Sequence, residues 1–521
     1  MAALAVDTFR HWAWLSAFGA VLAFLAAGYL YLEAGEPQHF IAFALILTVA
    51  AITIPERSLT PRHSGTMLIE ILREKQWFKG GMSNFPTRLA GLVFISASLV
   101  PLWVQTNEDG TFWFGLTAVL ILLAMATLWM QQARALADVT IVPLLVLPLM
   151  LVQEVWERRS VSRAWEDAIS RLPEVAAPWT VTILLAIGLV VTLVLAWRSI
   201  RQAPYPMIWA FAAAAFAPVV ASVLEMFWEP ARVIGTYNWA WHVLVVAGVM
   251  VLLAQYFARL DGLARQRVAL FTLAALTMIS LALMLMLSDA ALTLALAAMV
   301  LAAVLLDRRF NMAYLGVFVI AGVGVIGWRL VLDPGIFWAT NAPFWQFFAA
   351  YGGTVLLLSM SWMQLAGRDR TRTFAVVDGA VWSLSATFAS LLVYRSIETY
   401  TPYQLERHAS VALIALVWLV SAANQIWRLR LAEIRRWIRI TLAAIYGLFG
   451  LATMALVLTF LNPLYEYGEP AFGPYILDSL FIAFALPGLL FLAVAIKFDH
   501  VINVRCGGLG CVPEFNIDRL A

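Results

Sequence analysis

Apolar runs of membrane-spanning length follow one another almost to the end of this 521-residue chain, and Lys and Arg gather in alternate gaps between them. A spanning helix needs about 20 mostly apolar residues, because lipid offers no partners for backbone N–H and C=O groups. The composition agrees, since 12% of the residues are charged, against about 25% in soluble domains. The sequence therefore predicts an all-α, polytopic helical integral membrane protein.

Runs bounded by charge, Pro and Gly predict about sixteen transmembrane helices. They are expected near Trp12–Leu32, His39–Ile54, Leu89–Val104, Thr111–Met130, Ala135–Val152, Trp179–Trp197, Met207–Phe227, Trp239–Ala258, Val268–Leu287, Ala290–Leu306, Met312–Leu332, Pro343–Ala366, Phe374–Tyr394, His408–Trp427, Trp437–Leu461 and Tyr475–Ile496. Ser288 and Asp289 are expected to form a tight turn between the ninth and tenth runs, because a merged run would be too long for one span.

The distribution of Lys and Arg predicts the orientation. If the N-terminus is cytoplasmic, the inside gaps carry most of the 34 Lys and Arg residues, and most outside loops carry none. The positive-inside rule predicts this bias, and one merged or split span would scramble it. We therefore expect a multi-pass protein of the bacterial cytoplasmic (inner) membrane with both termini cytoplasmic. The first span is expected to be an uncleaved anchor, because no small-residue cleavage site follows it.

Residues 1–498 are expected to form one transmembrane helical bundle with two interfacial segments. Residues 56–88, on the cytoplasmic side, contain Met67–Phe78, whose apolar and charged residues divide onto two helix faces. Residues 154–178 form the one strongly charged external loop. Its Trp156 and Trp165 suit an amphipathic helix on the outer surface. The alternative, which the sequence favours for both segments, is simple padding of the lipid interface.

Residues 499–521 are expected to be a short cytoplasmic tail. The two cysteines of the chain, Cys506 and Cys511, lie in it, so disulfides are not expected to hold the fold together. The spacing of this single pair is a poor match to a zinc site. The sequence assigns no role to either cysteine.

Polar-proline pairs indicate a weak four-helix repeat. Glu229-Pro230, Asp333-Pro334 and Asn462-Pro463 end the seventh, eleventh and fifteenth runs, and a short aromatic loop follows each pair. Proline cannot continue a helix, and the residue before it is pushed out of helical dihedrals. One explanation is a four-helix unit duplicated several times, as in many transporters. The alternative is that any external hairpin has this form.

Ionisable residues inside apolar runs are the usual pointers to function, because a charge near the bilayer centre costs several kcal/mol. Here they gather in the outer third, and the cytoplasmic half offers no candidate beyond solvated basic loops. The candidate residues of an outward-facing polar pocket are Glu225, His242, Arg329, Asp333 and Arg395. Such a pocket would bind a lipid headgroup, an anion or a polysaccharide precursor, because the planar guanidinium makes two-point contacts with phosphate or carboxylate. The alternative is a set of snorkelling and locally paired charges.

Motifs with defined chemistry are absent from the sequence. It contains no P-loop, no Gly-rich nucleotide-binding pattern, no His-Glu-x-x-His and no Gly-x-Ser-x-Gly. We therefore expect no catalytic residues, no cofactor and no metal. The bilayer is the one partner that the sequence predicts. Nucleic acid is not expected, because the arginines are accounted for by orientation, and the sequence identifies no protein partner and no oligomeric state.

Four segments carry a resemblance to a known family. They are Arg329-Leu330-Val331-Leu332-Asp333-Pro334, the aromatic run Trp345–Gly352, the helix end Val393-Tyr394-Arg395 and the hairpin Asn462-Pro463-Leu464-Tyr465. On these motifs the chain resembles the predicted bacterial membrane-protein family called domain of unknown function 2339, most clearly from Arg329 to about Lys497. The resemblance implies a multi-pass helical architecture and leaves the function open. Members are commonly longer, with a charged N-terminal region, so we expect a shortened member or a piece of a longer protein.

Three classes of function stay open. The first is a non-enzymatic membrane protein of the cell envelope, a scaffold or a transport component. The second is a secondary transporter or a flippase for lipids or lipid-linked precursors, against which the scarcity of charges in the inner half argues. The third is a polytopic envelope glycosyltransferase that would use Glu33 or Glu36 as its base. However, the loop that holds them is only a few residues long, and the large external domain typical of such enzymes is missing.

Overall fold

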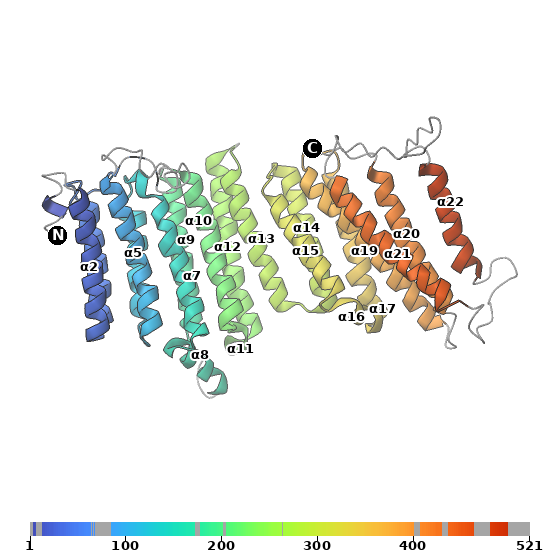
Figure 1. The fold of residues 1–521 in the computed structure, drawn as a ribbon, viewed down its shortest axis with the longest axis horizontal. Coiled ribbons are helices and arrows are strands. Elements are labelled where there is room, and N and C mark those ends of the chain that lie inside the picture. The colour runs from blue at the N-terminus through green and yellow to red at the C-terminus, as the bar shows by residue number, and fades with distance from the viewer. Residues whose placement is uncertain are drawn as a thin grey trace, which may run out of the picture. The chain divides into compact units, whose positions relative to one another are not determined.

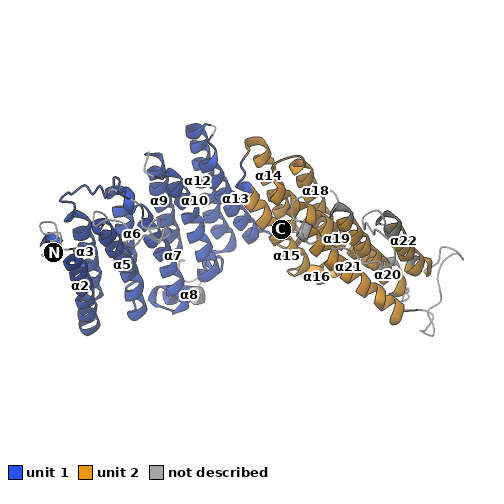
Figure 2. Ribbon diagram, turned by 45° about the horizontal axis from the view of Figure 1, so that its top comes forward, with its two compact units in different colours: residues 1–287, 312–315 blue, residues 288–311, 316–521 orange. Residues whose placement is uncertain are grey.

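The computed structural model describes residues 4–6, 13–63, 65, 67, 85–171, 178–201, 205–262, 264–400, 407–429, 436–462 and 480–498. Its regular elements in these ranges are all helical, which confirms the prediction of an all-α chain. The chain divides into two compact units (Figure 2). Unit 1 comprises Met1–Leu287 and Met312–Leu315, and unit 2 comprises Ser288–Asn311 and Gly316–Ala521.

In unit 1, long helices run up and down beside one another (Figure 1). In chain order the elements are α2 (Ala13–Ala34), α3 (Pro37–Thr53), α5 (Phe85–Asn107), α6 (Phe112–Ala124), η2 (Met125–Trp129), η3 (Arg134–Leu136), η4 (Asp138–Thr140), α7 (Ile141–Trp156), α8 (Ser160–Arg171), α9 (Thr180–Ile200), α10 (Pro206–Val223), η5 (Leu224–Trp228), α11 (Pro230–Ile234), α12 (Thr236–Asp261) and α13 (Gln266–Met286). The short helices α8 and α11 pack against each other, and α8 lies across the end of α7 (Figure 1).

In unit 2, several helix breaks interrupt the long helices. Its elements are α14 (Asp289–Phe310), α15 (Leu315–Val331), α16 (Gly335–Asn341), α17 (Phe344–Phe347), η6 (Phe348–Gly353), α18 (Thr354–Leu365), α19 (Thr371–Tyr400), α20 (Arg407–Leu429), α21 (Arg436–Thr459), η7 (Phe481–Ala485) and α22 (Leu486–Phe498). A bend of 56° separates α15 from α16. The neighbours α20 and α21 form a closely packed antiparallel hairpin (Figure 1).

Twelve helices among the described residues are long and apolar enough to cross a membrane, and the bent pair α15 and α16 makes a thirteenth if it is one span. Two shorter apolar helices, Pro37–Thr53 and Ala483–Ala493, lie where the second and sixteenth spans are predicted. The chain is thus a multi-pass membrane protein in contact with the bilayer, and the count of sixteen stays a prediction. The predicted turn at Ser288 is present, because α13 and α14 are separate helices.

Some expectations fall on residues outside the described ranges. These are most of the interfacial segment Met67–Phe78, the hairpin after Asn462 and the tail 499–521. The two described polar-proline hairpins are alike, because the short helix α11 begins at Pro230 and the short helix α16 begins directly after Pro334. The packing of the surrounding helices differs, since α9 packs on α10 in unit 1 whereas α14 packs on α18 in unit 2. The four-helix repeat and the single bundle of residues 1–498 both stay predictions.

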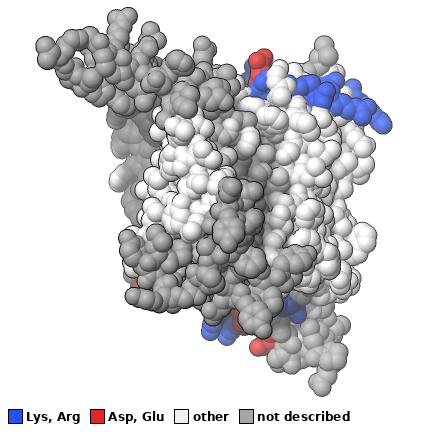
Figure 3. Space-filling view, turned by 90° about the vertical axis from the view of Figure 1, so that its right-hand side faces the viewer, with Lys and Arg blue, Asp and Glu red and all other residues white. Residues whose placement is uncertain are grey.

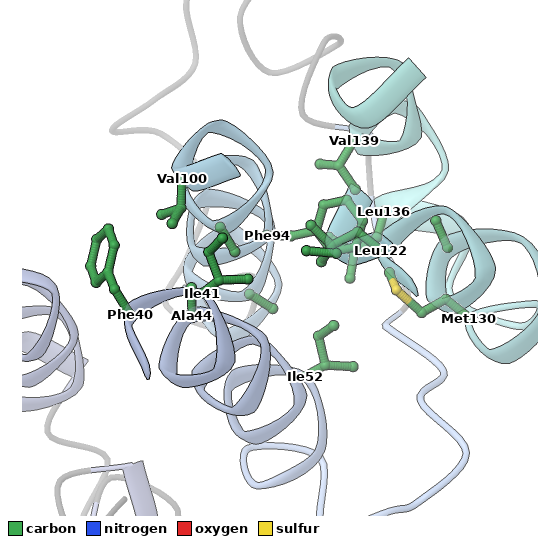
Figure 4. Close-up of a cluster of buried hydrophobic side chains, with 14 of the residues drawn as sticks. Phe40, Ile41, Ala44, Ile52, Phe94, Val100, Leu122, Met130, Leu136 and Val139 are labelled. Atoms are coloured by element: carbon green, nitrogen blue, oxygen red, sulfur yellow. The ribbon is translucent and has the colours of Figure 1, made fainter. Parts of the chain in front are cut away.

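Apolar side chains and small residues hold each unit together. In unit 1, Phe40, Ile41, Phe94 and Leu122 bring α3, α5 and α6 into one buried cluster (Figure 4). Lipid tails are as apolar as leucine, so helices in a membrane gain most from close van der Waals packing at small residues. In unit 2, Gly450 of α21 fits this rule. A Cβ there would lie 2.9 Å from Leu419 Cγ on α20.

The lipid-facing surface is apolar and grooved. In Figure 3, the described Lys, Arg, Asp and Glu residues that are visible lie at two opposite edges, and the described residues between these edges are uncharged. A groove of about 490 Å³ runs between α6–η2 and α9, lined by Leu123, Leu128, Ile187 and Val190 among others. A second groove of about 330 Å³ lies between α10–η5 and α13. Both grooves are formed by membrane-spanning helices.

Candidate functional site

Helix α8 is attached to unit 1 by a carboxylate that lies outside the helix. Asp109, in the turn between α5 and α6, accepts a hydrogen bond from the backbone N–H of Ser160 at 2.7 Å and forms an ion pair with Arg163. The first N–H groups of a helix have no partner within it, and Asp109 supplies one. The pKa of the Asp109 carboxyl is lowered, chiefly because the Ser160 N–H stabilises the charged form.

Glu154 near the end of α7 makes the second attachment. Its buried carboxylate accepts hydrogen bonds from Gln105 Nε2 at 2.8 Å and from the Val161 N–H at 2.9 Å. Its backbone carbonyl accepts the Ser162 hydroxyl at 2.7 Å. Glu154, expected at the start of a loop, therefore joins α5, α7 and α8 from within a helix.

Tryptophans make the remaining contacts that hold α8 in place, and we call these contacts, together with those of Asp109 and Glu154, the seat of α8. Trp165 donates its indole N–H to the carbonyl of Trp228 at 2.9 Å, and Trp228 donates to the carbonyl of Leu151 at 3.1 Å. An amphipathic helix thus lies where the sequence predicts one, at Ser160–Arg171. The two tryptophans singled out there differ, however, because Trp165 is 3% exposed and Trp156 is 79% exposed. Contacts with protein, and not with the lipid interface alone, position α8.

The predicted site residues Glu225 and His242 meet on one tryptophan. Trp239, fully buried in α12, donates its indole N–H to Glu225 Oε2 at 2.5 Å. The imidazole of His242 stacks beside the Trp239 ring, with the centroids 5.8 Å apart. Its two nitrogens lie 2.7 Å from the Asn238 carbonyl and 3.0 Å from the hydroxyl of Thr182 on α9. Glu225 lies in the π-helical turn η5, a kind of turn frequent at functional sites.

The other three predicted site residues lie in unit 2. Arg329 reaches the start of α14, with Nε 3.4 Å from the Thr293 hydroxyl and Nη2 3.5 Å from the Asp289 carbonyl. Arg395 of α19 donates to the Ala339 carbonyl of α16 at 2.6 Å, and its guanidinium lies over the Phe347 ring. Asp333 is exposed, and within the described ranges it forms no ion pair with Arg329.

The five predicted residues are therefore divided between the two units. Glu225 and His242 come together in unit 1 through Trp239. In unit 2, Arg329 and Arg395 contact different helices, α14 and α16. A single pocket that all five share stays a prediction. Within the part of the chain that the structure describes, no three His, Cys, Asp or Glu residues are grouped so as to hold a metal ion.

Buried charges also occur in the half of unit 2 where the sequence offered no candidate. Asp378, in the second turn of α19, has a side chain that is only 4% exposed. Its Oδ2 lies 3.3 Å from Arg439 Nη2 of α21, and its Oδ1 accepts the indole N–H of Trp362 at 2.9 Å. Nearby in the fold, Asp307 of α14 pairs with Arg370, which precedes α19. Among the described residues of unit 2, two ion pairs thus lie at the edge where α14 and α20 end and α19 and α21 begin.

A polar contact continues from this edge into the spans. The hydroxyls of Ser383 on α19 and Tyr446 on α21 are hydrogen-bonded, one to two turns deeper than Asp378 and Arg439. The sequence holds a weak signal for these residues, since Asp378 interrupts one apolar run and Arg439 begins another. The sequence does not show that Asp378 and Arg439 pair, because a third helix lies between their two helices along the chain.

Comparison with known proteins gives one match. The family described as predicted membrane protein (DUF2339) matches residues 86–505, which is most of the chain and includes all five predicted site residues. Searches among curated proteins and among solved structures gave no significant match. The resemblance noted from the Arg329–Pro334 hairpin is confirmed and extends well into unit 1. The chain is a multi-pass membrane protein that belongs to the DUF2339 family.

Proposed function

We propose that this protein is a non-enzymatic scaffold of the bacterial cell envelope, located in the inner membrane with both termini cytoplasmic. The observation that carries the proposal is the seat of α8. Asp109, Glu154 and Trp165 all direct their polar groups into contacts that hold α8 across the helix ends of unit 1. A translocation path needs polar groups that face a passage, whereas these groups fix a rigid external surface.

An outward-facing polar site is part of this proposal. Arg329 is its best-supported member, because its contacts to Thr293 and Asp289 are as long as 3.4 and 3.5 Å. Such long contacts leave guanidinium donors for a headgroup phosphate or another anion. Asp333 and Arg395, in the same unit as Arg329, are proposed to border this site. Arg329→Ala should then abolish function and leave membrane insertion intact. A variant that only fails to accumulate would instead support a structural role for Arg329.

A crosslinking experiment tests the scaffold. A photo-reactive residue in place of Glu166, on the exposed face of α8, should give discrete protein adducts in intact cells. The matched control is Leu145 of α7, a lipid-facing residue that should give lipid adducts only. Adducts that are identical at both positions would contradict a specific external scaffold.

A secondary transporter is the second candidate, and the intramembrane contacts of unit 2 favour it. Asp378, Arg439, Ser383 and Tyr446 form polar contacts inside apolar helices, where transporters place their sites. Reconstituted vesicles discriminate between the two functions. The scaffold should move neither a lipid probe nor a proton-linked anion faster than protein-free vesicles do. A rate clearly above the protein-free rate would overturn the scaffold proposal.

The glycosyltransferase is the least supported function. Only Gly35 and Glu36 separate α2 from α3, and Glu36 Oε2 lies 3.2 Å from His39 Nδ1. A catalytic base needs a substrate-sized space beside it, and this turn is very short. The double substitution Glu33→Gln with Glu36→Gln should therefore leave growth and envelope polysaccharide unchanged. Loss of a polysaccharide in this variant would instead support the glycosyltransferase function.

A further inference from the structure

The groove between α6–η2 and α9 is lined almost wholly by hydrocarbon. Its lining residues are Leu, Ile, Val and Ala, with the exception of Thr127. The Thr127 hydroxyl donates to the carbonyl of Leu123 at 2.6 Å, so its proton is already used within the helix. Leu128 and Val190 line the groove and are nevertheless exposed, because the groove opens to the surrounding lipid. A chain of methylene groups is the kind of ligand that fits this space.

Arg198 of α9 joins the two walls at one end of the groove. It lies one helical turn beyond Val194, the last groove residue of α9. Its buried guanidinium donates through Nη2 to the Gln131 carbonyl at 2.8 Å, two residues past η2. Carbonyls at the end of a helix carry a partial negative charge, which favours this contact. Because the walls meet here, a chain in the groove must extend from this end toward the middle of the membrane.

The groove face of α9 continues beyond this end as Trp197 and Arg201. Trp197 lies three residues after Val194, and Arg201 lies four residues after Trp197, so all three share one helix face. The turn is helical up to Arg201, whose N–H donates to the Trp197 carbonyl at 3.2 Å. The exposed guanidinium of Arg201 lies over the Trp197 ring, 4.8 Å from its centroid. Among the described residues, no acidic side chain forms an ion pair with Arg201.

We propose that this groove and Arg201 bind one anionic phospholipid. One acyl chain of the lipid lies in the groove, and Arg201 binds the headgroup phosphate through the two-point contact that a planar guanidinium makes. Trp197 lies between them, at the interfacial depth where tryptophan is favoured. A cation without an acidic partner attracts an anionic headgroup more strongly than a zwitterionic one. This site is independent of the proposed scaffold role, because it uses none of the residues that seat α8.

Native mass spectrometry of the purified full chain in a neutral detergent tests the site, because it counts both bound lipids and copies of the chain. One arm adds phosphatidylglycerol, and a second adds phosphatidylcholine with the same acyl chains. Arg201→Gln removes the cation, and its matched control is Arg259→Gln, at an exposed arginine in the last turn of α12. Val190→Trp fills the groove, and its control is Val245→Trp, at an exposed position of α12 outside both grooves.

We expect the unaltered chain to retain one phosphatidylglycerol in preference to phosphatidylcholine. Arg201→Gln should bind phosphatidylglycerol about fivefold more weakly, which equals about 1 kcal/mol. Val190→Trp should retain neither lipid, because the indole occupies the space of the acyl chain. The two control variants should bind both lipids as the unaltered chain does.

Three results would overturn the proposal. The first is equal retention of the two lipids by the unaltered chain, and the second is an affinity of Arg201→Gln no lower than that of Arg259→Gln. The third is retention of phosphatidylglycerol by Val190→Trp, because the acyl chain would then lie elsewhere. A dimer that Val190→Trp alone dissociates would likewise overturn it, since a second copy of the chain would then cover the groove.

Discussion

Asp109 accepts the backbone N–H of Ser160 at 2.7 Å, so a carboxylate in the turn between α5 and α6 caps a helix that begins 51 residues later. Together with the hydrogen bond from Gln105 to Glu154, this bond connects the α5–α6 hairpin to α7 and α8. The same carboxylate pairs with Arg163 and accepts the N–H of Gly110 at 3.0 Å. The orientation of α8 therefore depends in part on the charge of Asp109.

That dependence predicts a response to pH. The pKa of Asp109 is lowered in the fold, so its stabilisation is complete above the ordinary value of 3.8 and is lost as the pH falls through the lower folded value. Amide hydrogens of α8 should lose exchange protection at acid pH. Asp109→Asn should show that low protection already at neutral pH, whereas Glu166→Gln, on the exposed face of α8, should not.

Glu154→Ala should lower the hydrogen-exchange protection of α8 more than a substitution of an exposed residue does. The substitution leaves the Val161 N–H and one N–H of the Gln105 amide without an acceptor, while the amide keeps its bond to the Met150 carbonyl. An unsatisfied buried donor costs about 1–3 kcal/mol. Glu154→Gln should lie between Glu154→Ala and the unaltered chain, because it retains an acceptor oxygen. Hydrogen exchange of α8 gives the measurement, and equal effects of Glu154→Ala and Glu157→Ala would contradict it.

Gly450→Ala should destabilise the α20–α21 hairpin. The new Cβ would lie 2.9 Å from Leu419 Cγ and 3.1 Å from the Leu419 backbone N, so α20 itself must move. Overpacking of this kind costs about 1–3 kcal/mol. Gly324→Ala in α15 is the control, since no atom lies within 4 Å of its Cβ. Thermal unfolding in detergent should separate the two variants.

Trp239→Phe tests the link between Glu225 and His242. Phenylalanine keeps the stacking with His242 but removes the N–H that Glu225 accepts. The loss should be about 1.5–3 kcal/mol, as for hydrogen bonds to charged groups. Trp241→Phe, at an exposed neighbour, should leave the melting temperature unchanged. Equal melting temperatures of the two variants would mean that the Glu225 contact contributes no stability.

The predicted orientation has a direct test. Reporter fusions after Arg201, Arg267 and Arg370 should report a cytoplasmic location, and fusions at Asp109, Arg163 and Ala339 should report an external one. A reversed pair of neighbouring sites would remove two spans from the predicted sixteen or shift the register. If all six fusions report the expected side of the membrane, the result supports both the predicted number of spans in this part of the chain and the cytoplasmic N-terminus.

The helices were predictable because lipid imposes a strict rule on the backbone. Apolar length and flanking charge located α9, α12 and α13 to within a few residues, and the Ser288 turn followed from the length limit. The seat of α8 was not predictable in the same way. Amphipathic patterning located the helix, but nothing in a hydropathy pattern connects Ser160 to Asp109 or tells Trp165 from Trp156.

The charged groups also divide into those that the sequence identified and those that it did not. Isolated charges such as Glu225 and Arg329 were identified because each interrupts an apolar run. Asp378 and Arg439 were missed because each lies near the basic end of a run, where a solvated loop residue looks the same. Their burial comes from the packing of α19 against its neighbours, which depends on contacts between distant segments. Sequence periodicity carries no information on such contacts.

The groove between α6–η2 and α9 has a consequence for the solubilised protein. Its 490 Å³ lie between branched aliphatic side chains at membrane depth, so in a bilayer acyl chains fill it. After removal from the membrane, the alkyl tails of the detergent must fill the groove instead. Tails too short to reach into the groove would leave the exposed faces of Leu128 and Val190 with fewer van der Waals neighbours. The half-life of the purified chain should therefore lengthen stepwise with detergent chain length, at a fixed headgroup.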